Sequence, residues 1–143
     1  MIGVFGAAGG GFDLARNTTG HLVSDPSLRT TVLLLLLTEG RALVEDVRTS
    51  EPRGGWWGNS YPDVDGRELG SRLHILTRGK ATAQTAALIE QEIRLRLQCL
   101  IDDGIAVSLD VDVSWSGDRW TALVGVRQDQ SRVEWVPLWE ETI

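Results

Sequence analysis

Two kinds of hydrophobic repeat divide the chain into a helical middle and a β-rich end. Residues 82–104 carry apolar side chains three or four positions apart, which predicts a helix that begins at Thr82 and ends at Gly104. On the polar side of this helix, Glu90 is placed to pair with Arg94 four residues later. The apolar stripe consists of Ala86, Ile89, Ile93, Leu97 and Leu100.

From Ile105 to Trp115 apolar and polar residues alternate, which predicts a half-buried strand. A second alternating run covers residues 119–127 after a turn at 116–118, and a third covers 132–136. Pro137 confines the third strand to an edge, because proline has no N–H to donate to a sheet. The three runs predict an antiparallel C-terminal β-meander.

Charged residues alternate with the apolar ones on the outward face of this predicted sheet. Asp110 and Asp112 on the first strand face Arg119 and Arg127 on the second. One interpretation is cross-strand pairing on a solvated face, worth roughly 0.2–1 kcal/mol per pair. The alternative is that the face docks a partner, and the sheet edges offer a further docking mode by strand addition.

The N-terminal region predicts less regular structure. Glycine-rich residues 1–11 predict a flexible arm. The stretches 12–15 and 21–23, on either side of the turn-forming residues 17–20, predict a short hairpin. Ser24 and Gly40 bracket a predicted helix whose five consecutive leucines leave no polar face, so we expect it to be covered on most sides.

A long irregular connection is predicted between residues 44 and 67, followed by a short helix over residues 68–78. The connection contains Trp56 and Trp57, which stand side by side between glycines. Either both cover the leucine-rich helix, or one packs inward while the other meets a partner. The whole pattern predicts one α+β domain over residues 1–143, with the meander and the N-terminal hairpin packed on about three helices.

The amino-acid composition argues against several classes of function. The 143 residues carry 14 Lys and Arg against 20 Asp and Glu, a net charge of −6, which argues against a nucleic-acid partner. The longest aliphatic run, residues 32–37, is far shorter than the roughly 20 residues of a membrane span, so we expect no membrane insertion. The single cysteine excludes an internal disulfide. Six tryptophans against two phenylalanines and one tyrosine are unusual; two lie in the long connection and four on or beside the meander.

The sequence gives little support for a catalytic function. His21, His74 and Cys99 lie outside known nucleophile motifs, and two distant histidines give no metal-ligand spacing. No phosphate-binding or dinucleotide-binding motif is present, so we expect no cofactor and no metal. One enzymatic alternative stays open: Glu51, Asp63 or Asp65 in the long connection as the paired carboxylates of a peptidoglycan-cleaving domain.

Asp102 and Asp103 occupy the last turn of the long helix, where the helix dipole disfavours negative charge. We therefore expect a basic partner for them, either within the chain or outside it.

Three motifs together resemble the baseplate wedge protein family of Mu-like contractile-tailed phages. They are residues 53–59 with their Gly-Trp-Trp-Gly element, residues 70–73 (Gly-Ser-Arg-Leu) and residues 100–104, followed by a Trp-rich chain end. The resemblance runs from about residue 12 to residue 139, although the family often has Arg at Gly54, Asp at Asn59 and an aromatic residue at His74. That family is in turn similar to the sheath-initiating wedge protein of T-even phages, long labelled lysozyme-like, and of type VI secretion baseplates.

The resemblance implies a non-catalytic structural subunit of the virion tail baseplate, assembled in the host cytoplasm and present in several copies around a sixfold assembly. It implies binding to other wedge proteins and to the tail sheath protein, with strand addition helping to start the sheath. The residues expected at the partner interface are Arg53, Trp56, Trp57, Arg72, Asp102 and Asp103.

Overall fold

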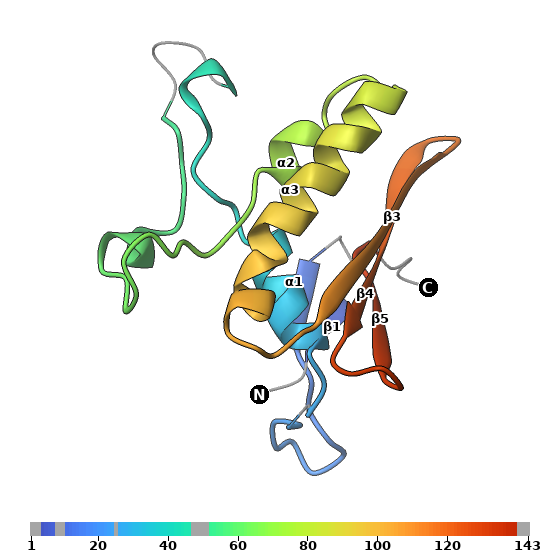
Figure 1. Cartoon of the computed structure of the whole chain (residues 1–143). Helices are drawn as coiled ribbons and strands as arrows, with labels where there is room; N and C mark the ends of the chain where they lie inside the picture. The colour runs from blue at the N-terminus through green and yellow to red at the C-terminus, as the bar shows by residue number, and fades with distance from the viewer. Residues whose placement is uncertain (1–3, 8–10, 25, 47–51, 140–143) are drawn as a thin grey trace.

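A three-stranded antiparallel sheet forms the C-terminal part of the protein and carries helices on one face (Figure 1). The computed structural model describes residues 4–7, 11–24, 26–46 and 52–139. Strands β3 (Ser108–Ser116), β4 (Arg119–Arg127) and β5 (Val133–Pro137) lie in the order β3-β4-β5, which confirms the α+β class and the C-terminal meander. Pro137 lies on an edge strand, as predicted.

The first strand begins three residues later than the alternation suggests. The N–H groups of Ile105 and Ala106 both donate to the carbonyl of Leu100, at 2.9 and 3.0 Å. These residues therefore finish the preceding helix rather than extend β3. The two-residue turn between β3 and β4 contains Gly117 at a φ of +69°, a conformation that glycine adopts without strain.

The alternation correctly predicts which side of the sheet is buried, except near the two ends of the first run, where Val107 and Trp115 are 66% and 43% exposed. The inward-facing residues of β4 all lie in the core, whereas the aspartates of β3 are exposed. The inward set consists of Trp120, Ala122, Val124 and Val126. On the outer face one of the predicted charge pairs forms, between Arg127 Nη2 and Asp110 Oδ2 at 3.6 Å. Arg119 contacts its neighbour Asp118 instead, at 3.4 Å.

Helix α3 (Ala83–Asp102) packs against β3 and is the helix that the sequence predicts most accurately. The Thr82 side chain caps its first turn by accepting from the Thr85 N–H at 3.2 Å. The predicted pair forms between Glu90 and Arg94, with 3.0 Å between the carboxylate and the guanidinium. The buried stripe includes Ile89, Ile93, Leu97 and Leu100, so the predicted periodicity is confirmed.

Helix α1 (Arg29–Leu37) begins five residues after Ser24, so the predicted cap is wrong. The cap comes from β5: the Glu134 carboxylate accepts from the N–H groups of Leu28 and Arg29, both at 3.1 Å. The expectation that α1 is covered on most sides is confirmed: Leu34, at 45%, is the one exposed residue among its nine, and four of the others are buried. Buried residues of α1, among them Leu36, join those of α3 and the sheet in a single core.

At the N-terminus, β1 (Val4–Ala7) pairs antiparallel with β2 (Gly11–Leu14). Part of the predicted arm is therefore a strand, while residues 1–3 and 8–10 lie outside the described residues. Of the predicted hairpin, the turn at residues 17–20 is present and is closed by one bridge between Arg16 and Leu22. Residues 12–15, which are predicted to pair across that turn, lie mostly in β2 and pair with β1.

Helix α2 (Leu73–Leu76) is a single turn, much shorter than the predicted helix over 68–78. The chain before it cannot be helical, because Gly70 has a φ of +107°. The long connection is confirmed, with two short 3-10 turns, Val44–Asp46 and Trp57–Ser60, in its described parts. No helix in the described part of the chain is both long and apolar enough to cross a membrane.

Candidate functional site

Residues 52–69, here called the tryptophan loop, extend from the helices on the side away from the sheet (Figure 1). Trp56 is 42% exposed and Trp57 is 76% exposed, and their ring centroids lie 5.6 Å apart. The interpretation that both cover the leucine-rich helix is therefore wrong. Gly58 is buried under the Trp56 ring, where a Cβ atom would lie only 2.2–2.4 Å from ring carbons. The Gly-Trp-Trp-Gly element needs its last glycine so that Trp56 can fold over it.

The start and the end of the tryptophan loop are both fixed by hydrogen bonds. Arg53 Nε donates to the Ala42 carbonyl at 2.7 Å, and the Ala42 N–H donates to the Arg53 carbonyl at 2.8 Å. Asn59 binds Leu69 at two points: its Nδ2 donates to the Leu69 carbonyl at 2.9 Å, and its Oδ1 accepts from the Leu69 N–H at 2.8 Å. Arg53, expected at a partner interface, is thus half-buried and engaged within the chain.

The Gly-Ser-Arg-Leu motif closes the base of the loop against the end of α1. The Gly40 N–H donates to the Ser71 carbonyl at 2.8 Å, and the Ser71 N–H donates to the Thr38 carbonyl at 2.9 Å. The backbones approach so closely that a Cβ atom on Gly70 would lie 2.8 Å from Gly40 N. The buried Ser71 hydroxyl also donates to the Leu36 carbonyl. This motif is therefore structural.

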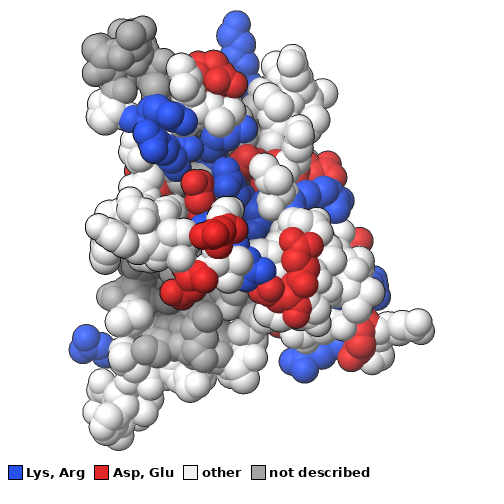
Figure 2. All heavy atoms as spheres, turned by 60° about the vertical axis from the view of Figure 1, so that its left-hand side comes forward, with Lys and Arg blue, Asp and Glu red and all other residues white. Residues whose placement is uncertain are grey.

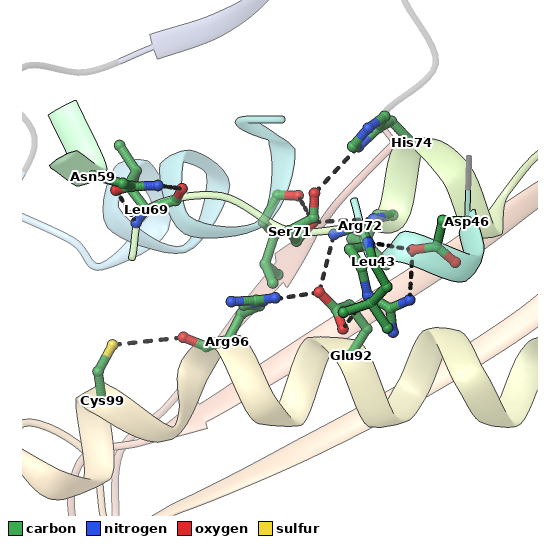
Figure 3. A network of polar contacts seen from close by, with 12 residues as sticks. Leu43, Asp46, Asn59, Leu69, Ser71, Arg72, His74, Glu92, Arg96 and Cys99 are labelled. Atoms are coloured by element: carbon green, nitrogen blue, oxygen red, sulfur yellow. Dashed lines mark hydrogen bonds and ion pairs between the residues drawn. The ribbon is translucent and has the colours of Figure 1, made fainter. Parts of the chain in front are cut away.

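Arg72 joins three parts of the chain beneath the loop (Figure 3). Its Nη1 lies 2.9 Å from Asp46 Oδ2 and its Nε lies 3.6 Å from Glu92 Oε2, while its backbone N–H donates to Glu92 Oε1 at 3.0 Å. Arg96 Nε contacts the same Glu92 oxygen at 2.8 Å, so two guanidiniums neutralise a carboxylate that is only 2% exposed. With 18% of its side chain exposed, Arg72 holds the base of the loop rather than offering its charge to a partner.

The charges of this network favour its ionised form. Burial acts against the charged form of Asp46, but the hydrogen bonds from Arg72 and from the Leu43 N–H outweigh it and lower the pKa of the Asp46 carboxyl. Burial likewise opposes the charge of Arg72, but Asp46 and Glu92 raise the pKa of this guanidinium. The ion pairs therefore persist at neutral pH.

The two aspartates at the end of α3 have different partners. Both carboxylate oxygens of Asp103 accept from the Arg67 guanidinium, which lowers the pKa of Asp103 and supplies the expected basic partner from within the chain. Asp102 is exposed and accepts from the Gln98 side chain at 3.1 Å, and it forms no ion pair among the described residues.

A groove of about 660 Å³ lies between the tryptophan loop and α3. Its apolar lining includes Leu35, Trp56, Tyr61, Val64, Leu69 and Leu95. The face turned forward in Figure 2 shows acidic side chains next to basic ones, with uncharged surface on either side of them. This arrangement suits contact with another macromolecule better than it suits an enclosed reaction.

Among the described residues, no hydrogen bond or ion pair joins any two of those considered for catalysis. His21 is exposed in the N-terminal turn, whereas the His74 ring faces the Ser71 carbonyl at 3.2 Å. Burial raises the pKa of the Cys99 thiol, which therefore stays protonated at neutral pH. Asp63 and Asp65 are both exposed to water, and Glu51 lies outside the described residues.

Sequence reasoning finds the two tryptophans but misses the residues that hold them. These are Asp46, Asn59, Arg67, Glu92 and Arg96. The Glu-to-Arg spacing of four residues at positions 92 and 96 is a usable signal for one pair. The contacts of Asp46 and Asn59 depend on how the irregular connection folds back, which hydrophobic periodicity does not report.

The fold and the site define a small α+β domain that presents a tightly held, tryptophan-bearing loop. A protein-family model described as "Phage protein GP46" matches residues 28–132, and the chain belongs to this family. The resemblance to a Mu-like phage family is therefore confirmed, while the wider similarity to T-even and type VI secretion wedge proteins stays a prediction.

Two relatives are similar to the chain over part of their length. "Baseplate protein gp46" of Escherichia phage Mu is 47% identical over 66 residues, which are 45% of this chain and 43% of that protein. "Mu-like prophage FluMu protein gp46" of Haemophilus influenzae is 34% identical over 96 residues, 67% of this chain and 64% of that protein. The match thus spans less than two thirds of either relative.

Proposed function

We propose that this protein is a non-catalytic structural subunit of a phage tail baseplate and that the tryptophan loop contacts another baseplate protein. One observation carries the proposal: Trp57 is 76% exposed on a loop whose both ends are fixed by hydrogen bonds. Tryptophan is enriched among the residues that dominate binding energy at protein interfaces. Because the loop is already ordered, its tryptophans lose little conformational freedom on binding.

Family membership and the relatives support the baseplate assignment. The phage Mu relative carries the name baseplate protein, and its similarity to this chain reaches 47% identity. The finer parts of the proposal come from the wedge-family resemblance. We expect a place in the wedge, several copies around a sixfold baseplate, assembly in the host cytoplasm and a role in starting the sheath.

Strand addition is the mechanism we propose for contact with the sheath protein. Strands β3 and β5 are the two edges of the sheet, and an edge strand presents N–H and C=O groups that another chain can pair with. Pro137 removes one donor from β5, so β3 is the better acceptor of an added strand.

The test is complementation of a phage or prophage that lacks the gene, with Trp57→Ala as the variant. We expect infectious particles to fall by at least about tenfold, as for loss of an interface residue worth 1.4 kcal/mol or more. Leu88→Ala is the matched control, because Leu88 is also a large exposed apolar residue, 42% exposed, but lies on α3, outside the loop and both sheet edges. Circular dichroism of both purified variants establishes that each still folds.

Normal particle yield with Trp57→Ala would contradict the role of the loop. Purified tails that contain no copy of the chain on immunoblots would contradict the baseplate assignment itself.

A further inference from the structure

The groove beside the tryptophan loop has an apolar floor and an acidic rim. Leu95 is 62% exposed on the outer face of α3, opposite Trp56 and Val64 of the loop. Large apolar side chains that stay this exposed along a concave surface mark a site where another molecule binds. The volume of about 660 Å³ is enough for several side chains of a partner.

The charges that line this groove do not cancel. Its two guanidiniums already have partners within the chain: Arg67 binds Asp103, and Arg96 binds Glu92. The three remaining carboxylates of the groove, those of Asp63, Glu68 and Asp102, have no ion pair among the described residues. Asp102 also stands in the last turn of α3, where the helix dipole adds to the negative potential.

We propose that this groove receives a segment of a partner protein that carries large apolar side chains next to Lys or Arg. The apolar part fills the space between Trp56 and Leu95, and the cations meet the three carboxylates of the rim. A second copy of this chain fits poorly, because its 20 acidic residues outnumber its 14 basic ones and would bring like charge to the groove. The inference rests on the proposed function, since it describes the baseplate protein that the loop contacts.

The experiment places a photo-crosslinking p-benzoylphenylalanine at position 95 of the full chain, within assembled tails. A second protein with the same group at position 88 is the matched control, because Leu88 lies on the same helix, is 42% exposed and does not line the groove. We expect a crosslink from position 95 to a different protein, at a segment with apolar residues and a net positive charge, and no such product from position 88.

Charge neutralisation then tests the carboxylates. The triple variant Asp63→Asn, Glu68→Gln, Asp102→Asn should lower the position-95 crosslink yield by about tenfold, because cationic segments lose their attraction to the groove. The triple variant Asp110→Asn, Asp112→Asn, Asp118→Asn removes the same charge from the exposed sheet and hairpin turn and should leave the yield unchanged. All six residues are exposed, and circular dichroism verifies folding.

Each outcome has a definite meaning. A crosslink only to a second copy, or to an acidic segment, overturns the inference, as does an equal yield from the two triple variants. If tails contain the chain but give no crosslink from position 95, the inference is wrong and the proposed function still stands. Tails without the chain overturn the proposed function and the inference together.

Discussion

Replacement of Arg72 by alanine is the sharpest test of how the tryptophan loop is held. The family resemblance places Arg72 and Trp57 at the partner interface, and alanine at a residue that serves only a partner would leave the isolated fold intact. The structure separates them: Arg72 is 18% exposed and binds Asp46 and Glu92, whereas Trp57 is 76% exposed. The substitution Arg72→Ala should therefore destabilise the isolated protein, and Trp57→Ala should not.

The magnitude follows from the contacts that are lost. Removing one partner of a fully buried ion pair costs about 3–5 kcal/mol, because the other charge is left without compensation. Here Arg96 still contacts Glu92 at 2.8 Å, and the backbone N–H of residue 72 still donates to Glu92. The main loss is the 2.9 Å contact with Asp46, so we expect about 2–3 kcal/mol. For a domain of this size this lowers Tm by about 4–12 °C.

Urea unfolding followed by circular dichroism measures the difference. Arg78→Ala is the control, because Arg78 is exposed, carries the same charge and makes no ion pair within the described part of the chain; its effect should stay within about 0.5 kcal/mol. Arg72→Lys should recover part of the loss, since lysine keeps the charge but cannot direct two N–H groups at two carboxylates. A free energy of unfolding for Arg72→Ala within 0.5 kcal/mol of the Arg78→Ala value would refute the structural role.

Three further predictions concern stability. Glu134→Gln should lower the free energy of unfolding in urea by about 1 kcal/mol, because the carboxylate caps α1 through two N–H groups. An unchanged free energy would show that this cap does not stabilise the protein. Asp46 has a lowered native pKa, so its contribution is complete above its ordinary pKa of 3.8 and is lost as pH falls through the lower native pKa. Asp46→Asn should therefore flatten the acid limb of a Tm-against-pH curve, and an unchanged limb would contradict this. Gly70→Ala should cost about 3 kcal/mol from backbone strain and from contact with Gly40, whereas Gly20→Ala, with open space around it, should cost only the strain, about 1 kcal/mol; equal costs would argue against the close approach.

Periodic parts of the sequence predict their structure well, because burial of one face is a local property. The stripe of α3 and the alternation of β3 and β4 both report which side chains meet the core. The errors occur where a distant residue decides the local structure. Helix α1 begins at Arg29 because Glu134, more than 100 residues later, caps it, and nothing near Ser24 indicates this.

The sequence predicts which types of residue the candidate site contains, but not how those residues are arranged. Adjacent tryptophans between glycines indicate an unusual loop, and the structure exposes both rings. The expected roles of Arg53 and Arg72 rest on the motifs that carry the family resemblance, and arginine is common at interfaces. A guanidinium forms the same kind of contact with a carbonyl or carboxylate of its own chain, and only the folded connection reveals which of the two occurs.

The bridge between Glu39 and Ser71 joins the two ends of the segment that lies between them. Once the two ends of a loop are joined, its length has little effect on the rest of the domain, and doubling the length costs only about 0.6 kcal/mol. Homologues are therefore expected to differ in the length of this segment while they keep Asp46 and Arg67, which tie it to the rest of the domain, and the Gly-Trp-Trp-Gly element, which carries the exposed tryptophans.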